Sequence, residues 1–145
     1  MDTVGSLIDK MSIIEKRMEV SQQNKETVFE LKTQMGWLLL EMAHCIIDGY
    51  TGSRPLSFKK HKVYDSSVKA FENMGVDGLL PLIEQLKKHN RDLWDLEDKR
   101  RDASLSDSER LAAADQVSVS NKKRNDTIDD IDSKIDIFIN LIRQD

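Results

Sequence analysis

The chain has 145 residues, which is enough for one domain with a single hydrophobic core. Charged residues make up 33% of it and aromatic residues only 6%, a composition typical of long amphipathic helices and not of a β-sheet protein. The formal net charge of −4 argues against a dedicated nucleic-acid-binding protein, because such proteins need a large basic surface to displace counterions.

The sequence carries no pattern typical of export or of a membrane anchor. The segment 1–16 has acidic residues and no uninterrupted apolar core, so it does not resemble a signal peptide. The most apolar stretch, 37–47, is interrupted by Glu41 and His44 and is too short to span a bilayer. The single cysteine, Cys45, is expected to be a buried, inert thiol in a reducing compartment. We therefore expect a soluble cytoplasmic protein without a membrane span.

Hydrophobic periodicity predicts two helices in the first third of the chain. The first covers about 7–20, with Ser6 as its N-cap and Asp9 completing a capping box. The second covers about 24–48 and ends at Gly49, because glycine is favoured just after a helix. The short link between them predicts an antiparallel hairpin.

Two more helices are predicted in the second half. The third covers about 78–101, with Asp77 as its cap. The fourth begins at Ser106, where Ser106 and Glu109 form a second capping box. It continues toward Arg143, a length of roughly 38 residues or on the order of 55 Å. These two helices predict a second antiparallel hairpin.

The two hairpins, joined by a long irregular connection at about 49–77, predict an all-α, four-helix bundle in a single domain over 1–145. A connection of this length is more often functional than decorative. The far end of the fourth helix, around 135–142, is apolar and extends past what the first helix can cover. We therefore expect this end to pack against a second copy of the chain, in a homodimer.

Two segments place polar and charged residues in register with the apolar stripe of their helices. They are NRDLWDLEDKRR at 90–101 and NKKRNDTIDDID at 121–132. Buried amides and charges are costly unless they are partnered, so such residues remain in an apolar stripe only with a partner or a task. The candidate functional residues are Asn90, Trp94, Glu97, Asp98, Arg101, Asn121, Arg124, Asn125 and Asp126.

The same two segments resemble the N-x-x-L-W-x-x-E-D-x-x-R and N-x-x-R-N-D motifs of a bacterial family of all-helical domains with no assigned function. The opening LIDKMSI, at 7–13, is similar to the LIDK-type start of related small proteins. The resemblance implies a helical bundle in bacteria, in some cases near genes for glycosyl transfer and cell-envelope polysaccharide synthesis. It implies no reaction and no catalytic residue.

Helical rise decides whether the two segments can form one site. If the third and fourth helices turn at the short link between them, Glu97 and Asp126 are separated by on the order of 20 Å along the hairpin. Asn90 then lies about level with Asn121, so we expect these two to meet, whereas Glu97 needs a partner from another helix or from Arg110. Separate polar contacts that fix helix register are therefore favoured over one shared catalytic centre.

Several classes of chemistry find only partial support in the sequence. Facing carboxylates of a bundle can hold Mg²⁺, but the separation above argues against one compact site. All-helical nucleotide pyrophosphatases pair carboxylates one turn apart on each of two helices. Asp126, Asp129 and Asp132 have that spacing here, but Glu41 and Asp48 on the second helix are seven apart. The last helix has a passing likeness to helical chorismate mutases, without their pattern of basic residues. Zinc, phosphate-loop, dinucleotide and nucleophile-elbow motifs are absent from the sequence, and we expect no metal site and no cofactor.

A basic and aromatic stretch, 54–64, lies in the long connection. Its cations could bind phosphate or an acidic partner, or belong to a solvated loop whose aromatic residues rest on the bundle. These cations are Arg54, Lys59, Lys60 and Lys62. Elsewhere, Trp37, Trp94 and His44 are expected to lie in the core.

Two functional hypotheses follow. The leading one is a non-enzymatic interaction or accessory protein, a cytoplasmic helical bundle that docks a protein partner or its own copy. The alternative is a small enzyme or binding domain for a phosphorylated or nucleotide-sugar ligand, with or without a metal ion, in which 54–64 acts as a lid. The alternative requires the polar residues to line one cavity, whereas the leading hypothesis requires them to pair across helices.

Overall fold

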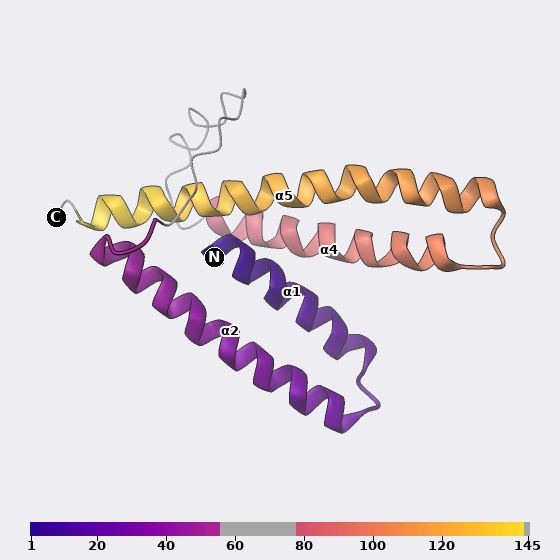
Figure 1. Ribbon diagram of the computed structural model, residues 1–145, viewed down its shortest axis with the longest axis horizontal. Coiled ribbons are helices and arrows are strands. Elements are labelled where there is room, and N and C mark those ends of the chain that lie inside the picture. Colours follow the sequence, from indigo (N-terminus) through magenta and orange to yellow (C-terminus); the bar gives the residue numbers. More distant parts are fainter. Residues whose placement is uncertain (56–77, 144–145) are drawn as a thin grey trace.

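The computed structural model describes residues 1–55 and 78–143 and is shown in Figure 1. Every regular element in these ranges is a helix, and none is a strand. The helices are α1 (Val4–Val20), α2 (Lys25–Thr51), α4 (Leu79–Arg101) and α5 (Asp107–Arg143). The predicted all-α architecture with four helices is confirmed.

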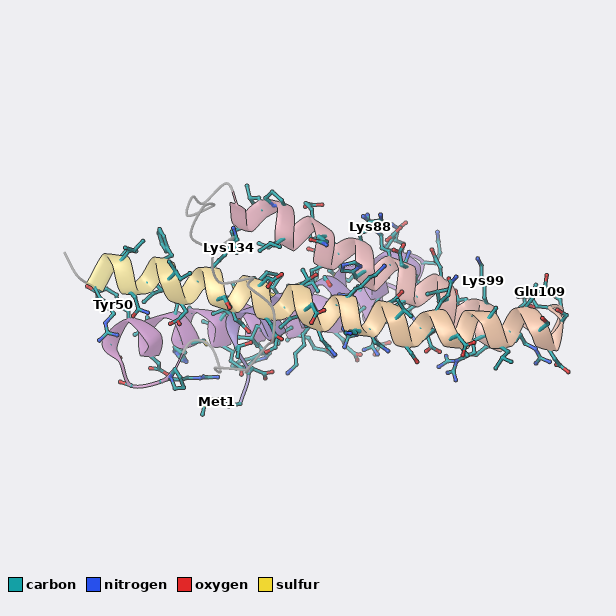
Figure 2. The ribbon with its side chains drawn as sticks, turned by 90° about the horizontal axis from the view of Figure 1, so that it is seen from above. Met1, Tyr50, Lys88, Lys99, Glu109 and Lys134 are labelled. Atoms are coloured by element: carbon teal, nitrogen blue, oxygen red, sulfur yellow. The ribbon has the colours of Figure 1, made fainter. Side chains whose placement is uncertain are left out.

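The helices form two antiparallel hairpins, α1–α2 and α4–α5, which are inclined to each other (Figure 1). α1 lies between α2 and the second hairpin and contacts all three other helices, whereas α2 contacts only α1 and α5. The turn end of the α4–α5 hairpin projects beyond the first hairpin. Figure 2 shows Lys99 and Glu109 near that turn and Tyr50 at the opposite end of the molecule. α1 is therefore the central helix, and α2 is the outermost.

The best-buried apolar cluster lies where α1 meets α2. Val4, Leu7 and Cys45 are at most 2% exposed. Partly buried apolar side chains pack against them from three helices: Ile8, Leu38, Met42, Ile46 and Ile135. Burial raises the pKa of the Cys45 thiol, because a thiolate would lose its solvation there. The expectation that Cys45 is buried is confirmed.

The start of α1 differs from the prediction. Thr3 is the N-cap, and its side chain accepts a hydrogen bond from the backbone N–H of Ser6. The Ser6 hydroxyl oxygen in turn accepts from the backbone N–H of Thr3 at 2.9 Å, which completes the capping box. The predicted box of Ser6 and Asp9 is therefore wrong. The helix begins earlier because the apolar spacing of α1 already includes Val4, and Asp9 is buried on another face.

The other helix ends agree with the prediction in part. α2 continues past Gly49, which is buried, and stops at Gly52, whose φ of +79° is the left-handed conformation that glycine adopts at helix ends. α4 follows Gly78 without a side-chain cap, and the predicted cap Asp77 lies outside the described residues. The sequence does not distinguish Gly49 from Gly52 as the end of α2, because either glycine can adopt the left-handed conformation that ends a helix.

The start of α5 is as predicted. The backbone N–H of Glu109 donates to the Ser106 hydroxyl at 3.2 Å, and the Glu109 carboxylate accepts from the backbone N–H of Ser106 at 2.9 Å. α5 then runs for 37 residues to Arg143. The capping box and the long last helix are both confirmed.

The far end of α5 is partly covered by the chain's own α2. Ile139 is buried, and Ile135 packs against the core cluster. Phe138, Leu141 and Ile142 remain exposed. The expected contact of these three residues with a second copy stays a prediction. Within the described ranges, no helix is both long and apolar enough to cross a membrane.

Candidate functional site

A polar cluster lies at the meeting point of three helices, and we call it the Asp9 cluster. It consists of Asp9 and Ser12 from α1, Asn90 from α4 and Arg124 from α5. The Asn90 side-chain amide donates to Asp9 Oδ1 at 2.8 Å and to Ser12 Oγ at 2.5 Å. Both N–H bonds of that amide are thereby used. The cluster joins both hairpins through α1.

The side chains of the Asp9 cluster are largely shielded from solvent, so their charged groups need partners within the protein. The Asp9 side chain is 10% exposed, and the Arg124 side chain is 28% exposed. Arg124 Nε lies 3.7 Å from Asp9 Oδ1, so the charges attract without a direct hydrogen bond between these atoms. Arg124 Nε is itself buried and has no hydrogen-bond partner. The Asn90 amide is therefore closer to the Asp9 carboxylate than Arg124 is. This hydrogen bond is important for stability, because a buried carboxylate without a hydrogen-bond donor is costly.

Sequence reasoning missed the α1 half of this cluster. Asp9 and Ser12 are three residues apart and so share one helix face. Apolar residues occupy several other faces of α1, including Leu7, Ile8 and Ile14. A helix that is apolar on several sides is a central helix, and a polar pair on its remaining face must then find partners. That pattern was the available signal.

A second polar contact fixes the start of α1 against α5. The backbone N–H of Gly5 donates to Asp132 Oδ1 at 2.6 Å, and Asp132 is only 5% exposed. A Cβ on Gly5 would lie 2.6 Å from the Ile128 carbonyl oxygen and 2.8 Å from Asp132 Oδ1. Glycine is therefore required here because the two backbones approach too closely for any side chain. The carboxylate also satisfies one of the free N–H groups in the first turn of α1.

The expected contact between Asn90 and Asn121 is not found. The Asn90 amide donates to α1 instead, and no hydrogen bond joins it to Asn121, a half-buried residue of the described part. The prediction failed because it considered only the α4–α5 hairpin. α1 packs against the α4–α5 hairpin at Asn90, and its residues Asp9 and Ser12 accept both hydrogen bonds of the Asn90 amide.

The predicted partners of Glu97 are also wrong. Its carboxylate lies 2.7 Å from Arg100 and 3.8 Å from Arg101, both in its own helix α4. Arg110, the other expected partner, pairs with Asp107 within α5. These are exposed pairs between residues three or four positions apart, which contribute little to stability.

Among the described residues, no hydrogen bond or ion pair joins the Asp9 cluster to six of the other motif residues: Trp94, Glu97, Asp98, Arg101, Asn121 and Asn125. Trp94 is half-buried, while Asp98 and Asn125 are exposed. Asp126 is half-buried and has an interaction partner of its own. Among the described residues, no group of three or more His, Cys, Asp or Glu side chains is placed to hold a metal ion.

The basic stretch of the long connection can be followed only at its start. The Arg54 guanidinium donates to the backbone carbonyl of Asp2 and so ties the end of α2 to the amino-terminal segment. Lys59, Lys60 and Lys62 lie outside the described residues. Arg54 is therefore engaged within the fold, and the proposed anion or partner site of the other three stays a prediction.

The outward face of α2 differs most from the prediction. Trp37 is 68% exposed and His44 is exposed, so neither is a core residue. α2 has apolar residues on two opposite faces, and the face with Leu31 and Cys45 is the buried one. We call the exposed face the α2 strip: Phe29, Thr33, Gly36, Trp37, Leu40, Ala43, Ile47 and Tyr50.

Residues 81–144 match a family model described as a protein of unknown function (DUF4254). The match covers less than half of the chain, and α1 and α2 lie outside it. It takes in nearly all of the α4–α5 hairpin and therefore both polar segments. No curated protein and no solved structure matches the chain. The similarity concerns the second hairpin and assigns no activity.

Proposed function

We propose that this protein is a non-enzymatic helical interaction protein, and that the α2 strip is the surface on which a partner helix docks. The observation that carries the proposal is the exposure of large apolar side chains along one face of α2. Phe29 is 71% exposed, Leu40 56% and Ile47 57%. A surface helix normally keeps its apolar residues on the buried face, so a second apolar face indicates a second contact.

The size of the α2 strip supports this proposal. The three aromatic residues of the strip, which are 49% to 71% exposed, offer on the order of 400 Å² if each side chain can bury about 150–250 Å². With the aliphatic residues the strip reaches on the order of 700 Å². Monomeric soluble proteins rarely expose a contiguous apolar patch of this size unless the patch binds a partner.

The biological setting forms part of the proposal. The resemblance of the polar segments to the bacterial family suggests cell-envelope glycan synthesis as the context, in the cytoplasm. An accessory protein there would act by holding a partner in place, and the rigid α1 contacts would keep the α2 strip correctly oriented. The Asp9 cluster has a structural task in this scheme, because it fixes α1 between the two hairpins.

Site-specific photo-crosslinking tests whether the α2 strip docks a partner. A photoreactive amino acid at Leu40 is expected to give a discrete heavier adduct in cells that express the full chain, because the partner helix lies against it. Leu111 in α5 is the matched control, since it is similarly exposed at 65% but lies outside the strip. Equal labelling at both positions, or none at Leu40, would contradict the proposal.

The second candidate function, ligand binding at the Asp9 cluster, is favoured by one observation, the unpartnered Nε of Arg124. A thermal-shift screen with Mg²⁺, nucleotides and nucleotide sugars separates the two functions. We expect no rise in Tm, because the cluster is already occupied by its own hydrogen bonds. A rise of several degrees that Arg124→Gln abolishes would favour the ligand-binding function instead.

A further inference from the structure

The α2 strip has the repeat of a helix-pairing surface. Leaving Trp37 aside, its members alternate three and four positions apart from Phe29 to Tyr50, which is the spacing that keeps one seam facing a partner helix. No member of the strip is charged. The seam extends over about three heptads, or roughly 30 Å of helix. This pattern fits a helix laid along α2 and does not fit a small molecule.

Gly36 lies in the middle of the strip, and no contact among the described residues requires a glycine there. A Cβ built on it would meet nothing within 4 Å, and its φ is not in the left-handed region. A glycine in the interior of a helix is destabilising relative to alanine. Close approach of another side chain or backbone would give this glycine a role, as Gly5 shows where α1 meets α5.

We infer that the docked helix is α2 of a second copy of this chain, in antiparallel orientation. The inference rests on the proposed function and names its partner. About a two-fold axis level with Leu38, three pairs of strip residues face each other. Gly36 then faces Leu40 of the second copy, Thr33 faces Ala43, and Phe29 faces Ile47. A surface that complements itself in this way is what an isologous dimer requires.

The antiparallel orientation follows from how the central residues pack. A parallel pair would bring Lys25 close to Glu30 of the second copy, but an exposed ion pair contributes little. It would also place Leu40 opposite Leu40 and Gly36 opposite Gly36, and the second pair leaves a gap. In the antiparallel pair each Leu40 side chain fills the space over Gly36 of the other copy, and the two-fold axis supplies this contact twice. Packing therefore favours the antiparallel orientation.

The area of the strip is sufficient for a stable dimer. Specific interfaces bury roughly 800 Å² on each partner, and the α2 strip, Trp37 included, offers on the order of 700 Å² before Leu39 is counted. Leu39, which is 46% exposed, and Trp37 flank the central contact on opposite sides. Near the two-fold axis each of them would meet its own counterpart. Within the described residues, α1 and α5 pack on the opposite face of α2 and leave the strip uncovered.

Analytical ultracentrifugation of the full chain tests the self-pairing. We expect a species of twice the 16.7 kDa chain mass. Leu40→Glu should weaken its association by roughly 100-fold or more, because each copy would bury a charge against Gly36. Leu111→Glu, at a similarly exposed apolar site outside the strip, should leave the dimer intact. Circular dichroism and Tm establish that both variants are folded.

Cysteine crosslinking tests the orientation. Leu39→Cys should give a disulfide-linked dimer under mild oxidation, because two copies of residue 39 lie close to the two-fold axis. Phe29→Cys should not, because the two copies of residue 29 would lie about 27 Å apart along the pair. Linkage through Phe29→Cys but not through Leu39→Cys would overturn the antiparallel arrangement.

The outcomes also separate this inference from the proposed function. A wild-type chain that sediments as a monomer at every concentration overturns the self-pairing. If photo-crosslinking at Leu40 then yields an adduct of another mass, the strip still docks a partner and only its identity is wrong. If both experiments are negative, the self-pairing and the proposed function fail together.

Discussion

Replacing Gly5 by alanine is expected to lower the free energy of unfolding by about 2–3 kcal/mol, the cost of forcing an extra methyl group into a close contact. The methyl carbon would lie 2.6 Å from the carbonyl oxygen of Ile128, which belongs to the α5 backbone and cannot rotate away. α1 must therefore move from α5, and the hydrogen bond from Gly5 to Asp132 weakens with it. Urea denaturation followed by circular dichroism measures the change, and Tm should fall by about 5–10 °C.

Gly36 provides the control for this substitution. It is also a glycine inside a helix, but a Cβ there meets nothing within 4 Å. In the Leu40→Glu background, where the α2 strip is unpaired, Gly36→Ala should raise the free energy of unfolding by about 0.5–1 kcal/mol. A loss of stability at Gly36 as large as that at Gly5 would mean that replacing a helical glycine destabilises the chain even without a close contact, so the contact with α5 would not explain the Gly5 result.

Replacing Asn90 by leucine is expected to destabilise the fold by about 2–4 kcal/mol, because two buried acceptors lose their donor. Asp9 would keep only Arg124, whose Nε is 3.7 Å away, and Ser12 would lose its contact with α4. The same urea titration measures this effect. Asn121→Leu is the matched control on α5: it makes no hydrogen bond with Asn90 in the described structure, and it should change stability by about 0.5 kcal/mol or less.

A double-mutant cycle shows whether the loss at Asn90 arises from the bond to Asp9. Asp9→Leu and Asn90→Leu together should cost less than the sum of the two single substitutions, with a coupling of about 1–3 kcal/mol. The reason is that the double variant no longer contains the buried Asp9 carboxylate, which Asn90→Leu alone would leave without its amide donor. Additive effects would show that Asn90 acts through general packing and that the Asp9 cluster does not hold the helices in register.

The helices themselves could be predicted, because each has a local cause. The capping box of Ser106 and Glu109 and the periodicity of α5 lie within one stretch of sequence. The partners of the polar residues could not be predicted in the same way. Periodicity indicates which face Asn90 occupies, but the partner is set by how α1 crosses the second hairpin. That crossing depends on a close contact at Gly5, far away in the sequence.

The two faces of α2 show a second limit of sequence patterns. Leu31 and Cys45 on one face and Trp37 and Leu40 on the other are equally apolar. Nothing in the spacing says which face the chain's own core takes, so Trp37 was predicted in the core and is exposed. α2 therefore carries two apolar faces, and within the described residues α1 and α5 cover one of them.

The bond between Gly5 and Asp132 joins positions 127 residues apart, and this separation has a consequence for synthesis on the ribosome. α1 and α2 emerge long before the residues that hold them, so the close fit at Gly5 and the pairing of Asp9 form only after α5 has been made. Contacts of high sequence separation form slowly because a long loop must close first. During that interval the α2 strip and the part of the buried face that α5 later covers are both open, which makes the nascent first hairpin the stage at which chaperones would be needed.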